Sequence, residues 1–275
     1  MKPALGIIAG AGNLPGELIE AAQAEGRSLF VIGVKGAGDP EIIARAPHGW
    51  VGIGSFGGLL KMLRDNNCEE VVFAGAVRRP SLKNLSLDWY GIRMMPKALS
   101  AARDGDGALL SLLVEEIEQQ GFRVVGAEQV AHNLAAPSGT LGSVEPSTQD
   151  LEDIAKGVTV VEHLGLLDIG QAAIVNDGLV LGVEAVEGTD ALIERCGQLS
   201  GNEAGVLVKI AKPDQERRVD LPTIGLQTVT NASAAGLKGI AFEAAGALII
   251  DREQVVKAAD DASLFLYGIE MSKIE

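Results

Sequence analysis

The sequence has few aromatic residues, few histidines and fewer basic than acidic residues. Only 4% of its 275 residues are Phe, Trp or Tyr, so its cores must be built mainly from Ala, Val, Ile and Leu. Hydrophobic residues still make up 47% of the chain, which excludes intrinsic disorder, because disordered chains lack the apolar side chains needed to fold. At about 150 residues per domain, this length predicts two domains.

Acidic residues outnumber basic residues in the chain as a whole. There are 23 Lys and Arg against 37 Asp and Glu, which gives a formal net charge of −14. Proteins that bind nucleic acid generally need a basic surface, so we expect no nucleic-acid partner. The deficit is uneven, because residues 1–137 carry a net charge of −2 and residues 138–275 a net charge of −12.

Cysteines and long apolar runs are also scarce. The two cysteines, Cys68 and Cys196, are far apart and form no CxxC pair, so neither a disulfide framework nor a structural zinc site is supported. The first residues form a short apolar run typical of a strand rather than a signal peptide, and no apolar run reaches the length of a membrane span. We therefore expect a cytoplasmic protein.

In the first half, short apolar runs alternate with helical patterns. Strands are predicted at 5–9, 29–34, 50–53, 71–75 and 122–126, and helices after residue 13, at 56–66 and at 106–119. This alternation is typical of an α/β fold with a mainly parallel sheet. We predict a Rossmann-like nucleotide-binding domain over residues 1–130. Residues 131–147 show no periodicity and are rich in Pro, Gly and Ser, which predicts a linker.

The remaining residues, 148–275, are predicted to form a second, mixed α/β domain. A turn signal at Asp177-Gly178 joins two apolar runs and predicts a β-hairpin, so antiparallel pairs are expected here. Helices are predicted at 148–163, 189–199, 227–235 and 252–262, with further strands at 205–210, 239–243, 247–250 and 264–267.

A glycine-rich loop follows the first predicted strand. Backbone amides in such a loop and at the start of the next helix favour a phosphate. The dinucleotide fingerprint G-x-G-x-x-G is met at Gly10 and Gly12, but Pro15 stands at its third glycine. A plain tight turn, a sugar-nucleotide or diphosphate site, and a nicotinamide site all remain open.

A basic stretch follows the strand at 71–75, where open α/β sheets bind their ligands. Between residues 78 and 103 one acid, Asp88, accompanies six basic residues: Arg78, Arg79, Lys83, Arg93, Lys97 and Arg103. Arginine forks bind phosphate well, although a solvated helix face would give the same composition. Large apolar residues are interleaved here, which suits an anionic apolar ligand or a membrane surface.

A third signal lies in the acidic half. Glu184, Glu187 and Asp190 gather near a predicted strand end, and residues 209–225 mix charges of both signs densely. Carboxylates that hold Mg²⁺ beside cations that hold phosphate would produce this pattern. Surface salt bridges would produce it equally well.

Six stretches, in order and spread over nearly the whole chain, resemble the LpxI family of UDP-2,3-diacylglucosamine pyrophosphatases of lipid A biosynthesis. They are residues 6–15, 74–82, 121–127, 168–172, 186–190 and 209–225. The sequence departs from the pattern expected for the family at Ala11, where a glycine is expected, and at Leu226-Gln227, where Pro-Asp is expected.

The resemblance implies a magnesium-dependent hydrolase whose second domain is catalytic. Water would attack the diphosphate of UDP-2,3-diacylglucosamine and release UMP and 2,3-diacylglucosamine 1-phosphate (lipid X). The protein would be cytoplasmic and in transient peripheral contact with the inner face of the inner membrane. A homodimer is expected only as the commonest oligomer. The alternatives are a nicotinamide-dependent oxidoreductase and a non-catalytic nucleotide or lipid carrier.

The same resemblance implies roles for particular residues. The catalytic candidates are Asp220, Asp190, Lys209 and Lys212, where the two lysines would bind phosphate, and the candidate metal ligands are Asp220 and Glu187. The candidate substrate-binding residues are Gly10, Gly12, Asn13, Leu14, Arg78, Arg79, Ser81, Gln171, Gly188 and Thr189. Acyl chains would be covered by Ile92, Met94, Met95 and Leu99.

Overall fold

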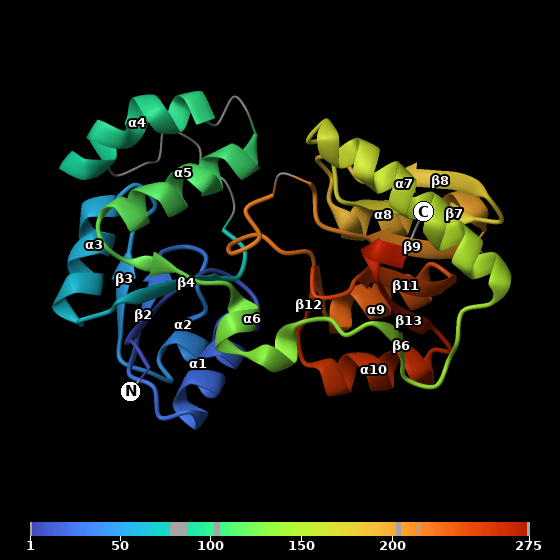
Figure 1. Cartoon of the computed structure of the whole chain (residues 1–275), viewed down its shortest axis with the longest axis horizontal. Helices are drawn as coiled ribbons and strands as arrows, with labels where there is room; N and C mark the ends of the chain where they lie inside the picture. Colours follow the sequence, from blue (N-terminus) through green and yellow to red (C-terminus); the bar gives the residue numbers. More distant parts are fainter. Residues whose placement is uncertain (1, 78–86, 102–104, 202–204, 214, 274–275) are drawn as a thin grey trace. The chain divides into compact units, whose positions relative to one another are not determined.

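The computed structural model describes residues 2–77, 87–101, 105–201, 205–213 and 215–273. The chain folds into two compact units, one of Met1–His132 with Arg218–Asp220, the other of Asn133–Arg217 with Leu221–Glu275 (Figure 1). Each unit is built on its own β-sheet. The predicted fold class, a Rossmann-like parallel-sheet domain followed by a mixed α/β domain, is confirmed.

The N-terminal unit contains a five-stranded parallel sheet in the order β3-β2-β1-β4-β5. Its strands are β1 (Leu5–Ala9), β2 (Leu29–Val34), β3 (His48–Val51), β4 (Glu70–Ala74) and β5 (Arg123–Val124). The strand order reverses between β1 and β4, and ligands of open α/β sheets bind outside the carboxyl ends of strands at such a point. The segments after β1 and β4 are therefore the places to search for a site in this unit.

Helices cover both faces of this sheet. Ile8 and Ile32 face a buried cluster that includes Leu60 and Leu63, while their neighbours Ile7 and Val31 are buried on the opposite face. One face carries α1 (Leu14–Ala24), α2 (Pro40–Ile43) and α6 (Ala127–Val130); the other carries α3 (Phe56–Asp65) and α5 (Asp106–Gln119). Helix α4 (Trp89–Ala101) packs on α3 and α5.

The C-terminal unit contains a six-stranded mixed sheet in the order β6-β13-β11-β9-β7-β8. Its strands are β6 (Gly139–Leu141), β7 (Ala172–Asn176), β8 (Leu179–Val183), β9 (Gly205–Lys209), β11 (Leu237–Glu243) and β13 (Phe265–Ile269). The predicted β7–β8 hairpin is confirmed, and both of its turn residues have positive φ, 47° at Asp177 and 75° at Gly178. The three strands β9, β11 and β13 are parallel, which the expectation of antiparallel pairs missed.

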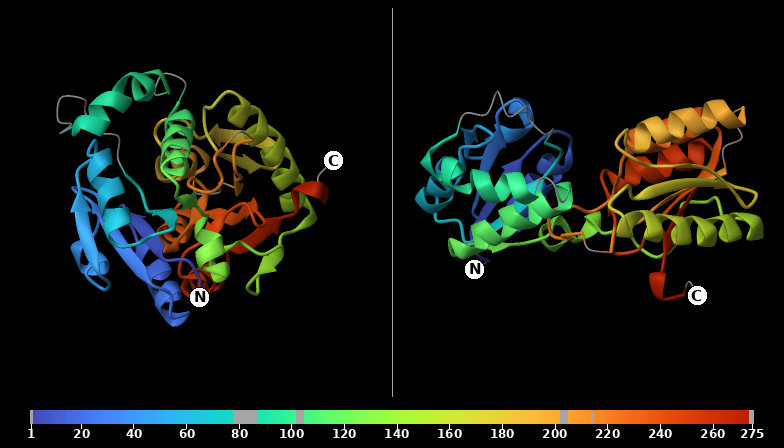
Figure 2. Two further views of the ribbon diagram at one scale, coloured as in Figure 1. Left: turned by 60° about the vertical axis from the view of Figure 1, so that its left-hand side comes forward. Right: turned by 90° about the horizontal axis from the view of Figure 1, so that it is seen from above.

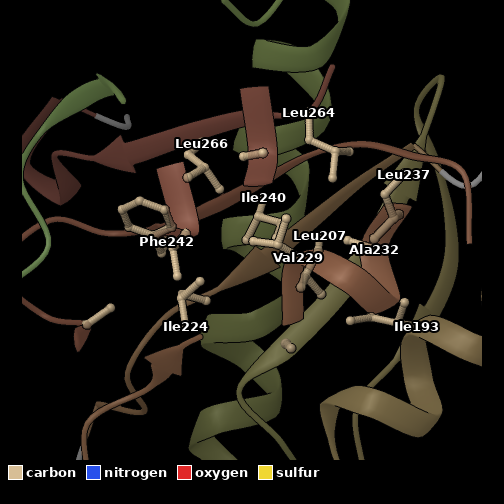
Figure 3. Packing of buried hydrophobic residues seen from close by; sticks show 14 of the residues in the cluster. Ile193, Leu207, Ile224, Val229, Ala232, Leu237, Ile240, Phe242, Leu264 and Leu266 are labelled. Atoms are coloured by element: carbon tan, nitrogen blue, oxygen red, sulfur yellow. The ribbon is translucent and has the colours of Figure 1, made fainter. Parts of the chain in front are cut away.

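The second sheet is also covered on both faces. Helix α7 (Thr148–Leu166) lies on one face, and α8 (Thr189–Ser200), α9 (Leu226–Ala234) and α10 (Arg252–Asp261) lie on the other (Figure 2). On the latter face Leu207, Ile240 and Leu266 extend from the three parallel strands toward Ile193 and Val229 (Figure 3). A separate parallel pair joins β10 (Thr223–Ile224) and β12 (Leu248–Ile249).

The predicted linker, residues 131–147, is instead largely part of the C-terminal unit. It contains η2 (His132–Leu134) and β6, which pairs with β13, and the Ala136 N–H donates to the Ala247 carbonyl over 2.9 Å. Because β6 has only three residues and its partner lies far along the chain, it leaves no periodicity in the sequence. The chain also returns to the N-terminal unit at Arg218–Asp220, which a single predicted boundary did not foresee.

Within the described residues, none of the helices combines the length and the apolar character needed to cross a lipid bilayer.

Candidate functional site

The loop after β1 is fixed by backbone hydrogen bonds to the segment after β4. The N–H groups of Gly10 and Ala11 donate to the carbonyls of Ala74 and Ala76 over 2.7 and 2.8 Å. A Cβ atom at Gly10 would lie 2.5 Å from the Ala76 oxygen, so only glycine fits this close approach. The amides of Gly10 and Ala11 are thus already used, and they are not free to bind a phosphate.

The loop opens at its next residues. Gly12 has a φ of 93°, and a Cβ atom there would meet nothing within 4 Å. Asn13 follows as the N-cap of α1, and Pro15 lies in the first helical turn. Gly12, Asn13 and Leu14 therefore form the part of the loop that presents a helix N-terminus to a ligand. Three further candidates after β4 (Arg78, Arg79 and Ser81) lie outside the described residues.

In the C-terminal unit, charged residues gather at the carboxyl ends of two neighbouring strands. Lys209 ends β9 and Glu243 ends β11, and only 8% and 6% of their surfaces are exposed. The Lys209 Nζ donates to the Thr223 carbonyl over 3.3 Å. Glu243 accepts from the Ala211 N–H over 3.1 Å and from Arg217 over 2.8 Å. The acid therefore orients a guanidinium whose side chain is 52% exposed.

Glu184 lies at the same edge of the sheet and forms hydrogen bonds with two of the candidate substrate-binding residues. Its carboxylate, 6% exposed, accepts from the Gln171 N–H over 2.9 Å and from the Thr189 hydroxyl over 2.6 Å. Gly188 is the N-cap of α8, with a φ of 81°. The structure thus places Gln171, Gly188 and Thr189 together. Among the described residues the buried Oε1 of Gln171 has no hydrogen-bond partner.

We call Gln171, Glu184, Thr189, Lys209, Arg217 and Glu243 the sheet-edge cluster. The sequence singled out Gln171, Glu184, Thr189 and Lys209 but missed the roles of Arg217 and Glu243. Only the adjacency of parallel strands brings Lys209 and Glu243 together, and no local spacing signals it. Lys212 lies close by in the chain and is paired with Asp168 over 2.6 Å.

Two of the three candidate carboxylates have partners of their own. Glu187 is paired with Arg195 over 3.0 Å, and its pKa is lowered by a hydrogen bond from its own backbone N–H and then by Arg195. Asp190, in the first turn of α8, accepts from the Asn231 amide over 2.9 Å. In each of these carboxylates the partner engages one oxygen, which leaves fewer acceptor sites for a metal ion.

Asp220 is different. It belongs to the segment Arg218–Asp220, here called the crossing segment, which packs with the N-terminal unit. Val219 contacts the buried cluster around α3 and α5, and Arg218 forms an ion pair with Glu118 of α5 over 2.7 Å. The Asp220 carboxylate is half-buried, and it forms no hydrogen bond or ion pair with any residue that the structure describes.

Comparison with known proteins covers both units. The sequence model of the LpxI N-terminal domain matches residues 4–134, and that of the LpxI C-terminal domain matches residues 137–267. A protein of Caulobacter vibrioides named UDP-2,3-diacylglucosamine pyrophosphatase LpxI is 45% identical over 273 residues, which are 97% of each chain. This chain belongs to the LpxI family.

Solved structures add little to the LpxI assignment. A UDP-glucose 4-epimerase of Thermus thermophilus is 14% identical, with a TM-score of 0.33, over 94% of this chain and 83% of the epimerase. An N5-carboxyaminoimidazole synthetase of Staphylococcus aureus is 13% identical, with a TM-score of 0.26, over 70% of this chain and 42% of the synthetase. Likenesses this distant carry no argument.

The LpxI resemblance also implied a Mg²⁺ ion. The described carboxylates fit a site in which one or two protein carboxylates hold the ion together with substrate phosphates and water. No three His, Cys, Asp or Glu side chains gather as a metal cage among the residues described. Magnesium, however, is usually held by one or two carboxylates together with substrate phosphates and water. A half-buried carboxylate without a partner, such as Asp220, suits that mode.

One residue assigned to acyl-chain cover is placed differently. Met94 is 7% exposed and packs into the core of the N-terminal unit, because it lies on the face of α4 that contacts α3 and α5. It is therefore not available to a ligand of this LpxI chain. Ile92 and Leu99 are 54% and 41% exposed, and Met95 is half-buried.

Proposed function

We propose that this protein hydrolyses the diphosphate of UDP-2,3-diacylglucosamine with Mg²⁺ and releases UMP and lipid X. Membership of the LpxI family and the name of the Caulobacter relative support the reaction. The observation that carries the residue assignment is the state of Asp220, a half-buried carboxylate without a partner among the described residues. Uncompensated acids of this kind are found where a metal ion or a reacting group completes them.

The anionic diphosphate needs cations and N–H donors. The open part of the β1–α1 loop offers Gly12 and the N-terminus of α1, where the helix dipole favours negative charge. Arg217, oriented by Glu243, and Lys209 supply positive charge in the sheet-edge cluster. Lys212 would contribute once phosphate competes with Asp168 for its ammonium group.

Asp220 is the residue we propose to hold the Mg²⁺ ion. The ion would supply electrostatic stabilisation of the charge that develops on the phosphate oxygens and would lower the pKa of a bound water. Glu187 and Asp190 remain secondary candidates, each with one oxygen engaged by Arg195 or Asn231. Gln171, held by Glu184, is proposed to bind substrate through its side-chain amide.

The test is UMP release from UDP-2,3-diacylglucosamine, measured with Mg²⁺ and again with EDTA. We expect release that EDTA abolishes, and a fall of about 100-fold or more in kcat for Asp220→Asn, the scale at which removing one charge-stabilising group acts. Asp261→Asn, at an exposed acid ending α10, is the matched control. Near-normal turnover of Asp220→Asn at saturating Mg²⁺ would disprove the assignment of this residue.

Two binding measurements would identify the alternatives. Binding of lipid X without any UMP release would favour a carrier. Tight NAD(P)H binding in a fluorescence titration would favour an oxidoreductase. We also propose that the protein is cytoplasmic and makes transient peripheral contact with the inner face of the inner membrane. We further propose that it forms a homodimer.

A further inference from the structure

Exposed apolar side chains of the N-terminal unit are concentrated on one helix. In the described part of this unit the large hydrophobic residues with the most exposure are Trp89 at 80% and Ile92 at 54%, followed by Val77 at 44% and Leu99 at 41%. Three of these four lie on α4, which packs against α3 and α5 on the outside of its unit (Figures 1 and 2). Isolated exposed hydrophobics are ordinary, but a group on one element marks an interaction surface.

The spacing of these residues places them in one stripe. Trp89, Ile92, exposed Pro96 and Leu99 are separated by three, four and three residues, which is the spacing of one helix face. Arg93 lies four residues after Trp89, and Lys97 lies four residues after Arg93. At helical spacing these two basic residues lie along one border of the stripe. We call these six residues the α4 face.

The opposite side of α4 is firmly attached. Gly91 and Met94 are buried, and the Tyr90 ring packs on Phe56 with a centroid distance of 5.2 Å. The Tyr90 hydroxyl donates to Glu116 over 2.5 Å, and the Asp88 carboxylate accepts from the Gly91 N–H at the start of α4 and from the Gly58 N–H of α3. Because this side is committed, the helix cannot rotate to bury its apolar stripe within the unit.

The charge of the helix is opposite to that of the chain. Residues 89–101 contain Arg93 and Lys97 and no acid, on a protein with a net charge of −14. Lys97 is 63% exposed, and its ion pair with Glu116, at 3.8 Å, is long. The α4 face thus presents positive charge beside apolar side chains, which is complementary to a surface of anionic headgroups over acyl chains.

We propose that the α4 face docks on an anionic lipid bilayer, with Trp89 and Ile92 entering the headgroup region and Arg93 and Lys97 contacting lipid phosphates. Tryptophan prefers this interface because its ring is apolar and its N–H is polar. This proposal rests on the proposed function, because a diacyl substrate resides in a bilayer. Docking itself requires no turnover, so it can be measured separately.

The test uses the full chain and vesicles that contain no substrate. Trp50 and Trp89 are the two tryptophans, so Trp50→Phe leaves Trp89 as the reporter. We expect a blue shift of its emission and co-sedimentation with vesicles containing phosphatidylglycerol, with weaker binding to neutral phosphatidylcholine and weaker binding at high salt. Trp89→Ser should reduce partitioning about tenfold or more, and Arg93→Gln with Lys97→Gln should abolish the preference for anionic lipid.

Leu179→Ser is the control for exposed apolar area, because Leu179 is 64% exposed on the other unit and should leave partitioning unchanged. With detergent-dispersed substrate, Trp89→Ser is expected to release UMP at the wild-type rate. Absence of vesicle binding, or binding that Trp89→Ser leaves intact, would overturn the docking proposal.

Evidence that either of two other ligands occupies the α4 face would also overturn the docking proposal. Loss of turnover by Trp89→Ser in detergent would indicate that the face binds the substrate's acyl chains instead. A wild-type dimer that Trp89→Ser converts to a monomer would indicate a second copy of the chain. Failure of the proposed hydrolysis, by contrast, would leave binding to substrate-free vesicles unchanged.

Discussion

An ion pair and an apolar contact help to hold the crossing segment to the N-terminal unit, and their loss should reduce turnover without unfolding the protein. Glu118→Gln removes the partner of Arg218, and both side chains are 36% exposed, so the ion pair contributes about 0.5–1 kcal/mol. Val219→Ala removes methyl groups that are partly buried on the core, worth about 1 kcal/mol. The double variant should therefore weaken docking by about 2 kcal/mol.

This loss matters because the segment is short. Ordering a residue of the backbone costs about 1–2 kcal/mol, so ordering three residues costs about 3–6 kcal/mol, which more than offsets the contribution of these two contacts. The docked state is therefore only marginally stable, and losing about 2 kcal/mol releases most of the docked population. If the docked and released states are equally populated and Asp220 acts only from the docked position, kcat falls about 15-fold in the double variant and about threefold in each single variant.

The assay is UMP release at saturating Mg²⁺ and substrate, so that kcat is separated from KM. Glu115→Gln, a nearby exposed acid on the same helix, is the matched control and should retain full activity. Exchange of the two charges, Glu118→Arg with Arg218→Glu, should restore part of the lost rate, which a purely structural defect would not show. A double variant with wild-type kcat would refute the reasoning that docking positions Asp220.

Two further predictions concern stability. Asp153 is fully buried and accepts from the N–H groups of Asp177 and Gly178 over 2.8 and 2.7 Å, so Asp153→Ala should lower the free energy of unfolding by about 2–3 kcal/mol in urea titrations; an unchanged urea midpoint would contradict this. Glu70 pairs with buried Arg27, whose pKa is lowered by burial, so Glu70→Ala should cost about 3–5 kcal/mol, whereas Glu70→Leu with Arg27→Met should cost less. Equal losses in both variants would exclude the unpaired charge as the cause.

The elements best predicted from sequence are those whose signal is local. The helix predicted at 106–119 has the bounds of α5, because its leucines recur at helical spacing. The hairpin at Asp177-Gly178 is equally local. The strand predicted at 50–53 lies two residues earlier, at His48–Val51, because pairing with β2 rather than side-chain character sets its start.

The candidate site was harder to predict because its contacts join distant parts of the chain. The sequence indicated Lys209, Gln171 and Glu184, but Glu243, which orients Arg217, is identified by burial, which sequence does not display. Likewise, nothing local distinguishes Asp220 from Asp190.

The acidity of the C-terminal half does not conflict with an anionic substrate. Among the described residues several cations near the candidate site have an acid of their own: Arg217 with Glu243 and Lys212 with Asp168. Such acids hold the cations in place, and a diphosphate with its metal ion would meet oriented donors rather than a field of bare negative charge. The informative quantity is therefore the partner of each carboxylate rather than the net charge. Among the three candidate carboxylates, Asp220 is the one to which the described structure gives no partner.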